Sequence, residues 1–153
     1  MKKIFLGALC LLLCLGVSAK APVKIACVGN SITYGYTIEN RERDSYPAQL
    51  QRMLGEGYTV GNFGKSGATL LNKGHRPYMK QEEFQKALAF AGDIVVIHLG
   101  INDTDPRNWP DYRDFFVRDY LALIDSFRVV NPDVRILVAR MTPVSYTHLR
   151  AHE

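Results

Sequence analysis

Three short polar segments of the chain carry the residue types that acyl transfer requires. Ser31 lies in "GNSIT", directly after a short apolar run, Gly67 lies in "KSGAT", and Asn102 lies in "GIND". A serine hydroxyl attacks an ester once a base takes its proton, and hydrogen-bond donors that converge on the developing oxyanion lower the barrier. The Ser31 and Gly67 backbone N–H groups and the Asn102 amide are three such donors. The three segments together predict a serine-dependent acyl-transfer site.

Each segment also has a purely structural interpretation. Ser31 is a favourable helix cap, residues 66–67 are common turn residues, and residues 102–105 are residue types that begin a helix. Taken singly, each segment favours this interpretation, and only the combination favours catalysis. A glycine-bounded loop after a strand also binds nucleotides in many proteins. Residues 29–35 contain neither G-x-G-x-x-G nor the P-loop lysine pattern, so a nucleotide-binding module is a poor fit.

Short apolar runs and helical stretches alternate along the chain and would position these segments. The candidate strands are residues 23–29, 58–64, 93–100 and 133–140. The helical stretches between them are residues 45–55, 82–92 and about 110–127. This alternation with short connections predicts an α/β protein, a three-layer doubly wound parallel sheet. In such sheets ligands bind beyond the carboxyl ends of the strands, where all three polar segments lie.

The first nineteen residues have the pattern of a secretory signal. Two lysines precede a short apolar run, and Val17 and Ala19 are small residues at the expected cleavage site. The apolar run is too short to span a bilayer stably. We therefore predict a signal peptide over residues 1–19, export to the periplasm or beyond the cell, and no stable membrane span after signal removal. A lipoprotein anchor is less favoured, because Cys10 and Cys14 each follow leucine.

Charge and cysteine content exclude several functions. The chain of 153 residues has a formal net charge of +4, of which Lys2 and Lys3 contribute two, so nothing argues for nucleic-acid binding. Outside the predicted signal Cys27 is the one cysteine, which rules out an internal disulfide and a cysteine-type metal cluster. We predict that Cys27 is a small core residue and that the protein needs no metal and no cofactor. The sequence makes no prediction about oligomeric state.

The three segments resemble the first three sequence blocks of the SGNH hydrolases, also called GDSL esterases and lipases. The resemblance covers residues 23 to about 144, with the blocks in the right order after the right strands. It implies a flavodoxin-like fold with Ser31 as nucleophile. It also implies an oxyanion hole made by the backbone N–H groups of Ser31 and Gly67 and the side chain of Asn102. Asn30 stands where the family usually has aspartate, and an amide can still accept a hydrogen bond across the loop.

In this family the base and its orienting carboxylate form an Asp-x-x-His block after a fifth strand. His98 lies inside the third candidate strand and is predicted to be a core residue, whereas His75 lies in a loop and is predicted to contact substrate. His148 and His152 stand near the end of the chain, but neither has an aspartate three residues before it. The resemblance therefore identifies no catalytic histidine in this chain.

The end of the chain departs from the family. Residues 145–153, "SYTHLRAHE", resemble the translation of a transposase sequencing adapter. We predict that they are a non-native tail, and that residues 22–144 are an incomplete SGNH domain without its last strand, last helix and catalytic Asp and His. Such a fragment is expected to be poorly soluble and inactive.

Loops near the predicted site carry aromatic and cationic residues, which suit a polar, ring-shaped or anionic ligand better than a long acyl chain. These residues are Tyr34, Tyr36, His75, Arg76, Tyr78, Arg107 and Trp109. Through "NRERDSYPAQL" and "NDTDPRNWPDYRDFF", the chain resembles the N-terminal domain of exported bacterial sialate O-acetylesterases. That implies removal of O-acetyl groups from a sugar such as sialic acid. We expect His75, Arg107 and Trp109 to bind substrate, with Arg107 facing a sugar carboxylate.

Two alternatives stay open. A lipase or lysophospholipase would share the catalytic blocks and prefer long acyl esters to acetyl esters. A non-catalytic carbohydrate-binding relative would bind sugar equally well after Ser31→Ala.

Overall fold

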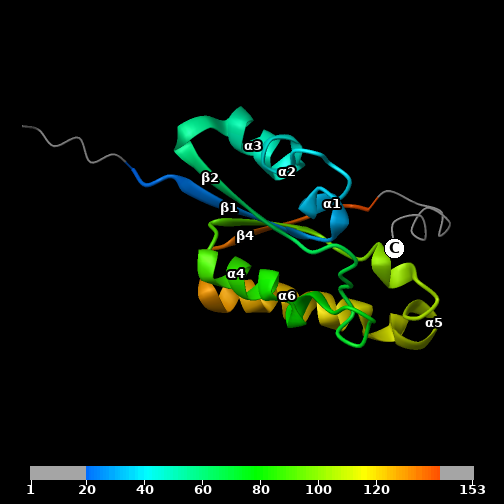
Figure 1. The fold of residues 1–153 in the computed structure, drawn as a ribbon. Coiled ribbons are helices and arrows are strands. Elements are labelled where there is room, and N and C mark those ends of the chain that lie inside the picture. The colour runs from blue at the N-terminus through cyan, green and yellow to red at the C-terminus, as the bar shows by residue number, and fades with distance from the viewer. Residues whose placement is uncertain (1–19, 142–153) are drawn as a thin grey trace, which may run out of the picture.

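The computed structural model describes residues 20–141, whose centre is a sheet of four parallel strands. The strands are β1 (Val23–Gly29), β2 (Tyr58–Gly64), β3 (Ile94–His98) and β4 (Arg135–Val138). Their order across the sheet is β2-β1-β3-β4 (Figure 1). The chain steps from β1 outward to β2, then returns past β1 to β3. The predicted α/β class with a doubly wound parallel sheet is confirmed.

Helices cover both faces of this sheet. They are α1 (Ser31–Tyr34), α2 (Arg41–Asp44), α3 (Tyr46–Leu54), α4 (Glu82–Phe90), α5 (Trp109–Tyr112) and α6 (Phe116–Val130). Short 3₁₀ turns lie at Gly55–Gly57, Tyr78–Lys80, Asn102–Thr104 and Arg113–Phe115. Helices α2 and α3 lie on one side of the sheet, and α4 and α6 lie on the other (Figure 1). This is the three-layer arrangement expected when right-handed crossovers run in both directions from β1.

The predicted third helix is interrupted. A single helix from near Pro110 was expected, but the structure has the short α5, a 3₁₀ turn over Arg113–Phe115, and then α6. The apolar face that predicted the helix begins at Phe116, whereas residues 111–114 offer three charged side chains and no apolar stripe. Because packing of an apolar face supplies most helical stability, nothing continues α5 as a regular helix through residues 113–115.

The apolar core lies between the sheet and helices α4 and α6. Val95 and Ile97 are alternate residues of β3 that are fully buried on this side, as the period of two in a strand requires. Leu123 and Phe127 of α6 pack into the same cluster. The Phe127 ring meets the Phe84 ring of α4 edge-on, with 6.1 Å between centroids. This core holds β1 and β3 in place beneath the polar segments.

The opposite side of the sheet is covered unevenly. Cys27 of β1 is fully buried there as a free thiol, which confirms it as a core residue, and burial raises its pKa to about 11. In the strand register Cys27 lies beside Val96, and Val96 beside Leu137 of β4. Leu137 is 47% exposed. Within the described part of the chain, β4 pairs with β3 alone, and this side of β4 is open to solvent.

Some predictions fall outside the described residues. The predicted signal peptide at 1–19, the predicted tail at 145–153, and His148 and His152 within that tail all lie there. Between residues 20 and 141 no helix has the length and apolar character needed to cross a membrane.

Candidate active site

Ser31 stands at a sharp turn between β1 and α1. Asn30 is the helix N-cap, and its Oδ1 accepts the Ile32 N–H at 3.0 Å, a bond within the turn itself. The hydrogen bond across the loop stays a prediction. The helix lasts one turn and ends at Gly35, whose φ is +83°. Because Asn30 does the capping, the structural interpretation of Ser31 as a cap is wrong. The Ser31 hydroxyl makes no hydrogen bond within residues 20–141 and is half-buried at the edge of the sheet.

The turn after β1 contacts the turn after β2. In the register Gly29 pairs with Gly64, and the Lys65 N–H donates to the Gly29 carbonyl at 2.9 Å. A Cβ at Gly64 would overlap the Tyr34 backbone nitrogen of α1. Glycine is therefore required there for α1 to approach β2. This contact joins the Ser31 segment to the segment that contains Gly67.

The segment after β3 is hydrogen-bonded to the Gly67 segment in turn. Asn102 Nδ2 donates to the Ala68 carbonyl at 2.9 Å. An amide nitrogen carries two hydrogens, so one remains for a ligand. Gly67 itself has a φ of +73°, a left-handed conformation that glycine adopts without strain. The three predicted segments thus meet at the carboxyl ends of β1, β2 and β3, beside the point where the chain reverses direction across the sheet.

Asp103 is a buried carboxylate that the motif analysis missed. Its two oxygens accept the N–H groups of Leu70 and Leu71 at 2.9 and 2.7 Å. Burial raises the pKa of Asp103, and the two N–H bonds oppose that shift. Asp103 directly follows Asn102, so its hydrogen bonds fix the distance between Asn102 and the Gly67 segment. The sequence did contain one sign that Asp103 matters for the site, because it directly follows Asn102, a predicted oxyanion donor.

His75 is held beside Asn102 by a second buried residue, Asn108. Asn108 Oδ1 accepts the His75 backbone N–H at 2.9 Å, and Nδ2 donates to the Asn102 carbonyl at 3.0 Å. These two bonds orient the amide, so the nitrogen at 2.9 Å from His75 Nδ1 is a donor and Nδ1 is its acceptor. The proton of a neutral His75 ring then resides on Nε2. The binding role of His75 stays a prediction.

The other predicted binding residues lie in different surroundings. Arg107 holds the buried carboxylate of Asp105, with Nη2–Oδ2 at 2.6 Å and Nε–Oδ1 at 3.0 Å, and this contact lowers the pKa of Asp105 to about 2. Trp109 is 39% exposed and packs edge-on against Phe116, with 5.7 Å between ring centroids. The guanidinium that was predicted to face a sugar carboxylate is therefore already bound to a carboxylate of its own chain.

Arg76 contacts the segment that contains Gly67. Its Nη1 donates to the Ser66 carbonyl at 3.0 Å, and a Cβ at Gly67 would lie 3.0 Å from the same nitrogen. This is the one hydrogen bond of the Arg76 guanidinium within the described residues. The sequence placed Arg76 near the site without assigning it a role.

His98 ends β3 opposite Gly29 and is half-buried rather than enclosed in the core. Burial lowers its pKa, which favours the neutral form of the ring. Among residues 20–141 no cluster of three His, Cys, Asp or Glu side chains could hold a metal ion.

Comparison with known proteins gives a consistent picture. The profile of the GDSL-like Lipase/Acylhydrolase family matches residues 27–153. An acetylxylan esterase of Xylanibacter ruminicola is 50% identical over 106 residues, which are 69% of this chain and 22% of that protein. The chain thus spans less than a quarter of the length of this curated relative.

Solved structures share the fold. AlinE4, an SGNH-hydrolase family esterase, superimposes with a TM-score of 0.59 at 20% identity over 83% of this chain and 63% of that one. A family two carbohydrate esterase from Clostridium thermocellum, solved in complex with cellohexaose, gives a TM-score of 0.62 at 24% identity, over 89% of this chain and 50% of that one.

Proposed function

The chain belongs to the GDSL-like lipase/acylhydrolase family, and from this premise we propose that the protein is a serine esterase that removes O-acetyl groups from a carbohydrate. The observation that carries the proposal is the meeting of the Ser31, Gly67 and Asn102 segments at one edge of the sheet, joined by the Gly29–Lys65 and Ala68–Asn102 hydrogen bonds. The 50% identical acetylxylan esterase supports an acetylated polysaccharide such as xylan as the substrate.

In this mechanism Ser31 Oγ attacks the acetyl carbonyl carbon. The oxyanion that forms accepts hydrogen bonds from the N–H groups of Ser31 and Gly67 and from the second Nδ2 hydrogen of Asn102. A histidine takes the serine proton and passes it to the departing sugar oxygen, leaving an acetyl-enzyme on Ser31. Water, deprotonated by the same histidine, then releases acetate and restores the hydroxyl.

The mechanism needs a histidine that takes the Ser31 proton. No histidine of the printed sequence has an aspartate three residues before it. We propose that residues 145–153 are not native, that the gene continues past codon 144 into a fifth strand and an Asp-x-x-His block, and that the 153-residue chain turns over far more slowly than the gene product carrying the block.

The test begins by sequencing the gene from source DNA through codon 144 and onward. The gene product is then assayed for acetate release from acetylated xylan, beside its Ser31→Ala variant. We expect Ser31→Ala to lower kcat by at least about 1,000-fold without changing the melting temperature. Retained turnover in Ser31→Ala would exclude the acyl-enzyme. Preference for long acyl esters over acetyl esters would favour the lipase alternative instead.

A sialic acid ester is a second candidate substrate, and Arg76 is the observation that favours it. A guanidinium beside Gly67 has donors left for a sugar carboxylate. In this case Arg76→Gln lowers kcat/KM for O-acetyl sialic acid by about tenfold, the loss of one charged hydrogen bond, with little effect on acetylated xylan. Arg107→Gln is the matched control. An equal loss on both substrates in Arg76→Gln would argue against a carboxylate-binding role.

Export is part of the same proposal, because an acetylated polysaccharide is met outside the cytoplasm. Mass spectrometry of the secreted protein is expected to find the N-terminus at Lys20. A mature protein that retains Met1 would refute the signal peptide.

A further inference from the structure

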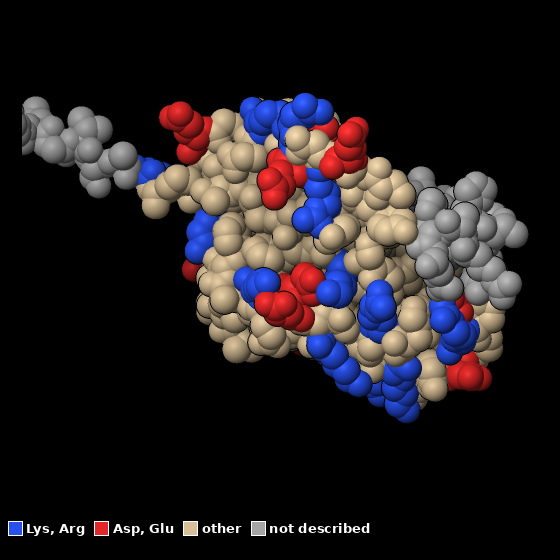
Figure 2. Space-filling view, viewed as in Figure 1, with Lys and Arg blue, Asp and Glu red and all other residues tan. Residues whose placement is uncertain are grey.

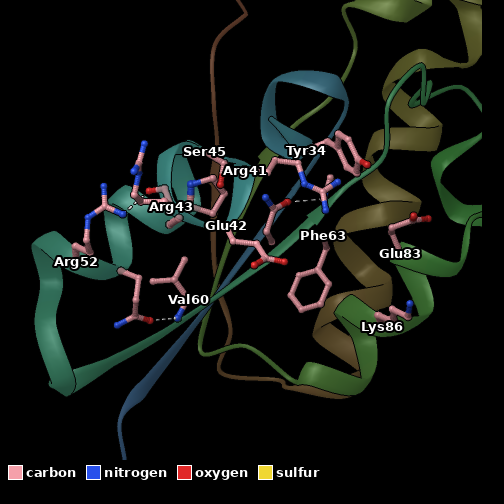
Figure 3. A pocket seen from close by; sticks show the side chains of 15 residues that line it. Tyr34, Arg41, Glu42, Arg43, Ser45, Arg52, Val60, Phe63, Glu83 and Lys86 are labelled. Atoms are coloured by element: carbon pink, nitrogen blue, oxygen red, sulfur yellow. Dashed lines mark hydrogen bonds between the residues drawn. The ribbon is translucent and has the colours of Figure 1, made fainter. Parts of the chain in front are cut away.

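A groove of about 690 Å³ crosses the outer edge of β2, between α2 and α3 on one side and α4 on the other. Figure 2 shows it as a hollow band between two groups of charged side chains. Its floor is formed by Val60, Phe63 and Gly64, and Glu42 and Glu83 face it from opposite walls (Figure 3). We call it the β2 groove.

The β2 groove begins close to the proposed nucleophile. Tyr34, which lines one end of the groove, is the last residue of α1, and Ser31 is the first. At 1.5 Å of rise per residue these two backbones lie about 4.5 Å apart along the helix axis. The floor residue Gly64 packs against the Tyr34 backbone, and the next residue, Lys65, donates to Gly29. A ligand that fills the groove therefore contacts Tyr34, at the end of the one-turn helix that begins with Ser31.

The lining suits an uncharged ligand with many hydroxyl groups. The Arg41 guanidinium lies over the Tyr34 ring, with its Cζ 3.9 Å from the ring centroid (Figure 3). Four cations line the groove, Arg41, Arg43, Arg52 and Lys86, against two anions, Glu42 and Glu83. Two of these cations are already paired with carboxylates outside the lining, Arg43 with Asp44 and Lys86 with Glu82. Such a lining offers both donors and acceptors around an apolar floor.

One acceptor in the groove lacks a donor. Glu83 Oε1 accepts from Lys65 Nζ at 3.0 Å, but Glu83 Oε2 is buried with no hydrogen-bond partner within the described residues. Buried polar atoms are nearly always paired, so an unpaired one at a groove wall marks a place for a ligand donor. A sugar hydroxyl is a donor of the right size.

A peptide is a poorer occupant, although exposed strand edges often recruit extended peptides. The side chain of Gln51 already occupies this edge: its Oε1 accepts the Val60 N–H at 2.7 Å, and its Nε2 donates to the Tyr58 carbonyl at 3.0 Å. Asn62 Oδ1 accepts the Gly64 N–H at 3.0 Å. An added strand would have to displace both side chains.

We propose that the β2 groove binds the unacetylated sugar units next to the esterified one, so that the enzyme recognises a neutral oligosaccharide chain rather than a single acetylated sugar. The proposal rests on the function proposed above. The Arg41–Tyr34 pair supports a sugar ring, and Glu83 Oε2 accepts one of its hydroxyl groups.

The kinetic test compares two substrates of the gene product, acetylated xylohexaose and 4-nitrophenyl acetate. Arg41→Ala and Glu83→Gln are expected to raise KM for acetylated xylohexaose about tenfold with kcat unchanged, the scale of one lost ligand contact. Neither is expected to change the kinetics with 4-nitrophenyl acetate, which is too small to reach the groove. Arg128→Ala, an exposed arginine of α6 outside the groove, is the matched control. Melting temperatures verify that each variant folds.

A binding test separates this proposal from the proposed function. Unacetylated xylohexaose is titrated calorimetrically into the Ser31→Ala protein and into the same protein with Arg41→Ala. One outcome is that no sugar ester is hydrolysed, but xylohexaose binds and Arg41→Ala weakens that binding. The β2 groove proposal is then supported and the esterase proposal is wrong. Equal xylohexaose affinity in both proteins, or equal KM in the Arg41 and Arg128 variants, overturns the groove. Competition for the groove by an extended peptide, without xylohexaose binding, overturns it as well.

Discussion

Two buried regions of the molecule are held by different contacts. One is the set of loops at the carboxyl edge of the sheet, and the other is the face of the sheet that α4 and α6 cover. At the edge, fully buried Asp103 and Asn108 make hydrogen bonds to backbone groups of neighbouring loops. Beneath the sheet, Ile97, Leu123 and Phe127 fill space with apolar side chains. A hydrogen-bonded contact has one geometry, whereas an apolar contact depends on volume. The edge can therefore position donors, and the core supplies the stability that keeps the edge in place.

Phe127→Ala tests the core side of this comparison and has the largest expected effect. Removing a ring that is 3% exposed leaves a cavity, and the free energy of unfolding is expected to fall by about 3–5 kcal/mol. Urea unfolding of the gene product measures it. Val129→Ala on the same helix removes a side chain that is 84% exposed and is expected to change the free energy by less than about 0.5 kcal/mol. Similar losses in both variants would mean that α6 is not packed as described.

Asp103→Asn tests the edge and has an intermediate effect. The amide presents a donor to the Leu70 and Leu71 N–H groups, so at least one buried N–H loses its acceptor and stability falls by about 1–3 kcal/mol. Because Asp103 positions Asn102, kcat on acetyl esters is expected to fall while KM changes little. Asp125→Asn, an exposed carboxylate of α6, is the control. A loss of stability with unchanged kcat would make Asp103 purely structural.

The pH dependence of stability at Asp105 and Asp103 also tests the edge, and it is the smallest of the three expected effects. The pKa of Asp105 is lowered to about 2. The stability that ionised Asp105 gives the folded state is therefore present above the unfolded pKa near 3.8 and is lost as pH falls toward 2. The pKa of Asp103 is raised in the folded state. The stability that protonated Asp103 gives the folded state is therefore present below the unfolded pKa near 3.8 and is lost as pH rises through the pKa of the folded state. Asp105→Asn is therefore expected to cost about 1–2 kcal/mol at pH 7 and much less at pH 2.5. Equal costs at both pH values would contradict the Arg107–Asp105 pair.

Much of the fold follows from local pattern. The run at 93–100 was nearly continuous in apolar residues, and it forms β3 at Ile94–His98. Ser45 and Pro47 marked the start of α3, and Gly55 its end. A helix does begin near Pro110, as predicted, but α5 ends at Tyr112, and α6 begins only at Phe116, where the apolar face starts. Predicted helix boundaries were wrong where a local start signal was not followed by an apolar face that could pack.

The candidate site divides in the same way. Ser31, Gly67 and Asn102 were identified from their segments, and the structure places those segments together. The contacts of Arg107 and Arg76 were not foreseeable, since a guanidinium pairs with whatever carboxylate or carbonyl the fold brings near it. Asp105 is close in sequence to Arg107, whereas Ser66 comes close to Arg76 only through the turn after β2.

The sequence by itself determined the parallel α/β class and the residue types at the ends of three strands, because apolar periodicity and glycine turns act over a few residues. The tertiary structure decided which donors Asp103 and Asn108 hold together, which arginine is already paired, and that a groove runs along β2 to Tyr34 at the end of α1. The bonds of Asp103 to Leu70 and of Asn108 to His75 join residues 33 positions apart in the chain, and only packing of the strands in the order β2-β1-β3-β4 brings them within hydrogen-bond distance.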